Sequence, residues 1–205
     1  MKDSADLKLR LRYDGISQSH FLRTLVSMYV SKDPLMLQIV EGNKPVIAKV
    51  HGAAYAAGCQ LVASCDLAYS TKDALFATPG VNIGLFCSTP MVAVSRKINK
   101  KPMMKMLLTG EPIKANFAKE IGLINDCFSK SKLNNEVLKI AKKIASKSNL
   151  TIKIGKRTFY KQLEMPLRKA YAHTSKMMTI NMMALDAKEG ISAFIEKRKP
   201  IWKNK

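Results

Sequence analysis

The residue types in this sequence that could do chemistry are concentrated in residues 44–84. There a β-branched run ends in His51-Gly52, and a run of very small residues, 53–58, follows with only Tyr55 interrupting it. This order indicates a strand, a tight turn and the start of a helix. Small side chains let a ligand approach the backbone closely, and the first N–H groups of a helix have no partner inside it. We therefore expect the turn to stabilise negative charge that develops on a bound group.

The elements that position this turn lie on either side of it. A strand over 46–50 leads into it, an apolar helix ends at Cys65-Asp66, and a second strand covers 67–70. Helical patterns dominate the rest, apart from a strand pattern over 123–128. We expect these helices over 17–40 with a division at Pro34, 88–98 with a cap at Ser88 or Thr89, 103–108 up to Gly110, 114–121, 132–147, 151–163, 166–187 and 189–198.

Composition limits the class of protein. A chain of 205 residues with 47% hydrophobic residues is expected to form one domain, or one domain with a small appendage. No apolar run reaches the length of about 18 residues that a membrane span needs, and the charged start shows no targeting segment. The four cysteines are expected to be buried free thiols, and the scattered histidines predict no metal site.

The net charge of +20 allows two interpretations. A solvated basic surface needs no specific partner, whereas a polyanionic partner needs the charge gathered on one face. Basic residues crowd into 96–105, 139–161 and 197–205, but no aromatic interleaving or RNA-binding motif accompanies them. A nucleic-acid-associated protein is therefore an alternative that the sequence does not favour.

Several motifs carry a resemblance to one family. KPVIA-x-V-x-G is followed by the small-residue turn, G-C-x-L, CD, F-x-x-P and I-G, and later by LLTGEPIKA, AKEIGLI and EGISAFIEKRKPIW. Together they resemble the crotonase superfamily of enoyl-CoA hydratases and isomerases over nearly the whole chain. The resemblance implies an α/β fold: a spiral of short ββα turns over residues 1–113, without the family's first strands, and then a helical trimerisation region over 114–205. It also implies that an acyl-CoA thioester binds with its carbonyl between two backbone N–H groups, which stabilise an enolate.

The resemblance assigns these two N–H donors to Ala5, in the string SADLK, and to Ala57, with Gly58 beside it in the substrate site. Lys8 would reach towards the CoA phosphates. A frayed N-terminus is the alternative explanation of the first match, and close helix–strand packing is the alternative for the second.

Two positions depart from the family's pattern. Hydratases of the family use two glutamates as general acid and base, but Gln60 stands in the place of the first and Gly80 in the place of the second. A Gln amide cannot take a proton at neutral pH, and each such group typically contributes a factor of about 10²–10⁴ in rate. Efficient hydration is therefore not expected, and restoring both glutamates is expected to raise it.

Three nearby residues could substitute for the missing groups, although each has a structural interpretation. Asp66 is expected to be a structural hydrogen-bond acceptor, and Glu111 a helix-terminus residue or else a pocket carboxylate. Cys59 could be a nucleophile for acyl transfer, but no histidine is placed to activate it.

The last helix carries the remaining candidates. Phe194 and Lys197 match the family positions that meet the CoA adenine and phosphate, often from a neighbouring subunit; alternatively, the Phe packs and the Lys is solvated. Trp202 is expected to be a packing anchor, and the methionines over 177–183 a core or subunit contact.

The resemblance implies an acyl-CoA thioester-binding protein of fatty-acid metabolism that forms a homotrimer or a dimer of trimers. Acyl-CoA is its substrate or ligand, and no further cofactor is implied. Three alternatives stay open: an enzyme that uses the N–H pair for another acyl-CoA reaction, a regulatory pseudoenzyme that binds acyl-CoA, and the nucleic-acid-associated protein. The compartment is expected to be the mitochondrial matrix or the cytoplasm.

Overall fold

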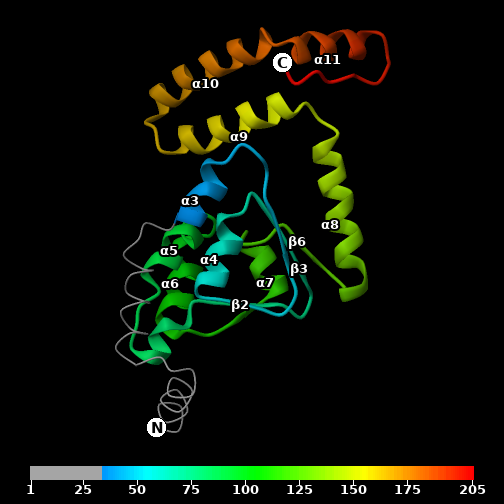
Figure 1. The fold of residues 1–205 in the computed structure, drawn as a ribbon. Helices are drawn as coiled ribbons and strands as arrows, with labels where there is room; N and C mark the ends of the chain where they lie inside the picture. Colours follow the sequence, from blue (N-terminus) through cyan, green and yellow to red (C-terminus); the bar gives the residue numbers. More distant parts are fainter. Residues whose placement is uncertain (1–33) are drawn as a thin grey trace, which may run out of the picture. The chain divides into compact units, whose positions relative to one another are not determined.

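The computed structural model describes residues 34–205, nearly all of which belong to one compact unit, Met36–Lys205 (Figure 1). The predicted helix ahead of Pro34 and the candidate site residues Ala5 and Lys8 lie outside the described residues. The first described helix is α3 (Pro34–Glu41); the division expected at Pro34 falls at the edge of the described residues and stays a prediction.

Two three-stranded sheets are built from alternating short strands. The first sheet has the parallel order β1 (Ile47–Val50), β3 (Leu67–Thr71) and β6 (Asp126–Phe128). In the second, β2 (Ala53–Tyr55) lies parallel to β4 (Leu75–Ala77), which pairs antiparallel with β5 (Ile113–Lys114). The expected strands over 46–50, 67–70 and 123–128 thus have counterparts in β1, β3 and β6, whereas β2, β4 and β5 were not foreseen.

The chain passes through the two sheets in a repeating ββ-helix order. β1 and β2 lead into α4 (Ala57–Ser64), while β3 and β4 lead into the short 3₁₀ helix η1 (Pro79–Ile83) and α5 (Ser88–Val94). The two turns stack in register, with Ile47 opposite Leu67 and Ala53 opposite Leu75. This stacking is the spiral of short turns that the family resemblance implies.

Helices α6 (Lys100–Thr109) and α7 (Ala115–Glu120) complete the packing around the sheets. Phe76 is the largest fully buried side chain among the described residues, and Val94, Met106 and Ala118 belong to the same buried cluster. α6 ends at Gly110, whose φ of 64° is easy for glycine, as predicted. The expected cap of α5 is corrected: Cys87, rather than Ser88 or Thr89, precedes the helix.

Four longer helices form the rest of the chain: α8 (Lys130–Ala145), α9 (Asn149–Leu163), α10 (Leu167–Met182) and α11 (Leu185–Ile195). α8 lies against the first sheet, whereas α9 and α10 lie side by side and antiparallel (Figure 1). The expected break between the last two helices near residue 188 is wrong. It falls at Met183-Ala184, because Ala184 has extended backbone angles and the chain turns there. None of the helices within 34–205 combines the length and apolar character that crossing a membrane demands.

A buried ion pair joins α9 to the sheets. The ammonium of Lys156 donates to the Asp66 carboxylate at 2.7 Å and to the carbonyls of Ile39 and Lys44 at 2.7 and 2.9 Å. Asp66 also accepts the backbone N–H of Val46 at 2.7 Å. The interpretation of Asp66 as a structural acceptor is therefore confirmed.

Apolar side chains on α10 and α11 face outward in this single chain. They include Leu167, Tyr171, Met178, Met182, Phe194 and Ile195, which are 60–85% exposed. Of the two expectations for the methionines over 177–183, a core position is excluded for Met178, Met182 and Met183, and a contact with another subunit stays a prediction. Trp202 does pack, with its ring against Gly190 and its indole N–H donating to the Ser146 carbonyl at 2.8 Å.

Candidate functional site

The turn between β2 and α4 is held in an unusual conformation. Ala56 has φ 47° and ψ −113°, a backbone region that residues with a Cβ rarely adopt and that costs about 1–3 kcal/mol. Its N–H donates to the Ala77 carbonyl and its own carbonyl accepts the Gln60 N–H, both at 3.0 Å. Sequence reasoning did not single out Ala56; the only available signal was that the turn is built from the smallest side chains.

This turn leaves the first N–H groups of α4 available. Ala57 is the first residue of the helix and is exposed, and neither its N–H nor that of Gly58 has an acceptor among residues 34–205. A Cβ added at Gly58 would meet only the Ala54 Cβ, at 4.0 Å, which is an ordinary contact. Helix–strand packing therefore does not by itself require glycine at this position, and the place of Gly58 in a substrate site stays a prediction.

Gln60 lies on the first turn of the same helix but, unlike Ala57, is buried. The residue is only 4% exposed, and its backbone carbonyl oxygen accepts a hydrogen bond from the Ser64 hydroxyl at 2.9 Å. Ala57, Gly58 and Gln60 are thus brought together on one helical turn, as the sequence predicted.

Gly80, the second residue of η1, lies three residues after Ala77, whose carbonyl holds the turn. A bent segment covers it: its N–H donates to the Cys87 sulfur at 3.2 Å and its carbonyl accepts the Leu85 N–H at 3.0 Å. A Cβ at this position would be 2.7 Å from the Leu85 carbonyl oxygen and 2.9 Å from Cys87 Sγ. The structure therefore leaves no room for a side chain at the position where the resemblance places the family's second glutamate.

The thiol of Cys59 is unsuited to nucleophilic chemistry. It has no exposed surface, and burial, followed by the nearby Cys87, raises its pKa to about 12. A thiol with such a pKa is protonated at neutral pH, so the structure does not support acyl transfer through Cys59.

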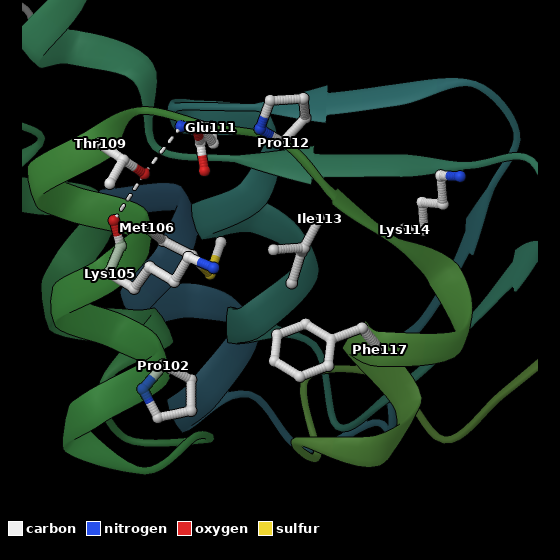
Figure 2. A pocket seen from close by; sticks show the side chains of 9 residues that line it. All are labelled: Pro102, Lys105, Met106, Thr109, Glu111, Pro112, Ile113, Lys114 and Phe117. Carbon is white, nitrogen blue, oxygen red and sulfur yellow. Dashed lines mark hydrogen bonds between the residues drawn. The ribbon is translucent and has the colours of Figure 1, made fainter.

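Glu111 lies just beyond α6, where its N–H donates to the Thr109 hydroxyl oxygen at 3.2 Å. It borders an open cavity of about 330 Å³ between α6, β5 and α7, into which Lys105 and Phe117 project (Figure 2). The lining residues run from Pro102 to Phe117, so α4 and η1 take no part in this cavity. Glu111 is thus a helix-terminus residue that also faces a cavity, and its chemical role stays a prediction.

Phe194 and Lys197 lie at the far end of the chain, where α11 packs against α10. Phe194 is 85% exposed, so the alternative in which it simply packs within the chain is wrong. Lys197 follows the helix with φ 53°. Their role at CoA stays a prediction, as do those of Ala5 and Lys8 outside the described residues. Within 34–205, no three His, Cys, Asp or Glu side chains gather in a way that could hold a metal ion.

Comparison with known proteins supports the family resemblance that the sequence motifs carry. The family model for enoyl-CoA hydratase/isomerase matches residues 22–205. Human enoyl-CoA hydratase domain-containing protein 3, mitochondrial, is 45% identical over 212 residues, covering 98% of this chain and 70% of the relative. The mouse protein of the same name is 51% identical over 168 residues, 82% of this chain and 56% of the relative. This chain thus spans between just over half and 70% of the length of these relatives.

Solved structures agree with the fold. The crystal structure of the human protein has a TM-score of 0.87 at 46% identity, covering 91% of this chain and 74% of that one. An enoyl-CoA hydratase from Mycobacterium smegmatis has a TM-score of 0.83 at 45% identity, with 91% and 71% covered. The predicted α/β crotonase fold with a helical C-terminal part is confirmed. The sequence motifs, the stacked ββ-helix turns and these matches agree, and the chain belongs to the enoyl-CoA hydratase/isomerase family.

Proposed function

We propose that this chain binds an acyl-CoA thioester, with the Ala57 N–H donating to the thioester carbonyl and Gly58 beside it. The observation that carries the proposal is the turn at Ala56, where a costly backbone conformation leaves two N–H groups of α4 without acceptors among the described residues. Strain of this kind is retained where the surroundings impose it, commonly at ligand sites. Ala5 supplies the second N–H in this proposal.

The same proposal excludes efficient hydration of the bound thioester. Neither Gln60 nor Gly80 provides a carboxylate, and the neighbouring Cys59 holds its proton. Since general acid–base groups contribute about 10²–10⁴ each, a site with donors alone binds and polarises the carbonyl without moving protons. The protein is then a binding or regulatory pseudoenzyme, or an enzyme for another acyl-CoA reaction.

Assembly is part of the proposal. The exposed apolar residues of α10 and α11 form a surface of the kind that subunit contacts cover, and we infer a homotrimer or a dimer of trimers. In such an assembly Phe194 and Lys197 contact the CoA moiety bound by a neighbouring subunit, and Lys8 contacts its phosphates. The net charge of +20 suits a ligand with several phosphates.

The mitochondrial matrix is the proposed compartment, because the mouse and human relatives are named as mitochondrial proteins. A cytoplasmic location is the alternative, and organelle fractionation with an antibody to this chain distinguishes the two. The proposed setting is fatty-acid metabolism, where acyl-CoA thioesters are formed and consumed.

Calorimetric titration with two ligands tests the proposed function. Butyryl-CoA should bind about tenfold more tightly than butyl-CoA, the thioether that lacks the carbonyl oxygen, since one or two hydrogen bonds to that oxygen are lost. Equal affinities for butyryl-CoA and butyl-CoA would show that the N–H groups do not bind the thioester carbonyl. Binding of a random oligonucleotide with a steep salt dependence, and of neither CoA ligand, would instead support the nucleic-acid alternative.

A further inference from the structure

Gly80 is a glycine because of its neighbours and not because of its backbone angles. Its φ lies outside the left-handed region, so an L residue could adopt its conformation. The obstacle is contact, because a Cβ would approach the Leu85 carbonyl oxygen to 2.7 Å and Cys87 Sγ to 2.9 Å. Real Cβ atoms essentially never come this close, so any side chain at position 80 requires the segment over 85–87 to move.

Cys87 holds that segment in place. Its sulfur accepts the Gly80 N–H at 3.2 Å, while the Leu85 N–H donates back to the Gly80 carbonyl at 3.0 Å, so both polar groups of Gly80 are bound to the segment. Cys87 is only 7% exposed and belongs to the same buried cluster as Cys59. The two thiols are close enough for Cys87 to contribute to the raised pKa of Cys59.

These contacts place a buried thiol beside each position that lacks a family glutamate. Cys59 directly precedes Gln60 in α4, and Cys87 packs against Gly80. The space from which a second carboxylate would extend is therefore already occupied by sulfur and backbone.

We propose that Cys87 is a specificity-determining residue: its sulfur, by anchoring the 85–87 segment over Gly80, closes the position from which a second carboxylate would act. The proposal rests on the function proposed above, and it deepens it. The absence of hydration is then fixed by packing, and replacing Gly80 alone does not reverse it.

The first test is thermal unfolding of four variants of the full chain. Gly80→Ala should lower Tm by about 2–12 °C, the range for overpacking in a chain of this length. In a Cys87→Ala background the same substitution should cost at most about half as much. Gly155→Ala is the matched control, because nothing lies within 4 Å of its Cβ in the middle of α9; its Tm should rise by about 1–4 °C. Equal losses at Gly80 in the two backgrounds would overturn the role of Cys87.

The second test measures crotonyl-CoA hydration and binding together. The sequence alone led us to expect that restoring both glutamates would raise hydration, but the enclosure of Gly80 changes that expectation. Gln60→Glu with Gly80→Glu should hydrate no faster than the parent chain, and adding Cys87→Ala should raise kcat/KM by about tenfold or more. A triple variant that binds crotonyl-CoA but gains nothing, or a double variant already as active as the triple, contradicts the proposal. If no variant binds crotonyl-CoA, the proposed function fails, while the Tm comparison still decides what Cys87 does.

Discussion

Replacing Lys156 with methionine should destabilise this protein far more than any exposed lysine replacement. The Lys156 side chain is 5% exposed, and its ammonium donates to three oxygens, on Ile39, Lys44 and Asp66, within 2.9 Å. Methionine keeps the stem of the side chain and removes every donor. The Asp66 carboxylate, 16% exposed, would then remain a charge without its cation.

The magnitude follows from the burial of both partners. Removing one member of a buried ion pair costs about 3–5 kcal/mol, because the remaining charge stays desolvated. For a chain of about 200 residues this lowers Tm by roughly 6–20 °C. Replacing both partners, Lys156→Met with Asp66→Asn, should cost less than the sum of the two single changes, since the double variant carries no unpaired charge.

Urea unfolding, followed by circular dichroism and by the fluorescence of Trp202, measures these differences. Lys153→Met on the same helix is the matched control, because Lys153 is exposed; its effect should stay within about 0.5 kcal/mol. If Lys156→Met unfolds within about 1 kcal/mol of the parent chain, or if the single effects simply add, the ion pair does not hold α9 to the sheets as described.

Three further predictions concern the turn, the last helix and the core. Ala56→Gly should leave Tm unchanged or raise it by a few degrees, whereas Ala56→Val should lower it, because a β-branched residue is poorly tolerated at φ 47°; equal Tm values for the two variants would contradict the strain. The hydrogen bond from Arg198, followed by that from the Ile201 N–H, lowers the pKa of Glu189 from 4.5 to about 2. The stability difference between the parent and Glu189→Gln should therefore be complete above pH 4.5 and disappear as the pH falls towards 2 in pH-dependent melting; a difference that persists at pH 2 is the opposing result. Cys59, fully buried and with a pKa of about 12, should react with a thiol reagent at neutral pH only after denaturation, and mass spectrometry of the labelled peptide checks this.

Most helices and three of the strands could be predicted, because the residues that start, build and end them are neighbours in the sequence. The β-branched run before His51 became β1, and Gly110 ended α6 because a left-handed residue closes a helix there. The three strands of the second sheet are only two or three residues long, too short to show an alternating pattern. These strands form because neighbouring turns of the spiral pair with one another. Pairing between segments that are distant in the sequence cannot be predicted from either segment alone.

The sequence predicted which residues form the candidate turn, but it did not predict the backbone conformation of that turn or the contacts around it. The small residues around Ala57 indicated a turn with free N–H groups, and the structure provides one among the described residues. The conformation of Ala56 could not be foreseen, since alanine carries no sequence signal for a positive φ. Nor could the enclosure of Gly80, which depends on Cys87, seven residues away, folding back over it. These two features are set by tertiary packing.

NMR of crotonyl-CoA labelled with ¹³C at the thioester carbonyl, mixed with an excess of the protein, tests the central claim most directly. The account predicts that the carbonyl resonance moves downfield as N–H groups polarise the bound thioester, while no 3-hydroxybutyryl-CoA forms. An unshifted resonance, or rapid conversion to the hydroxyacyl product, would contradict it.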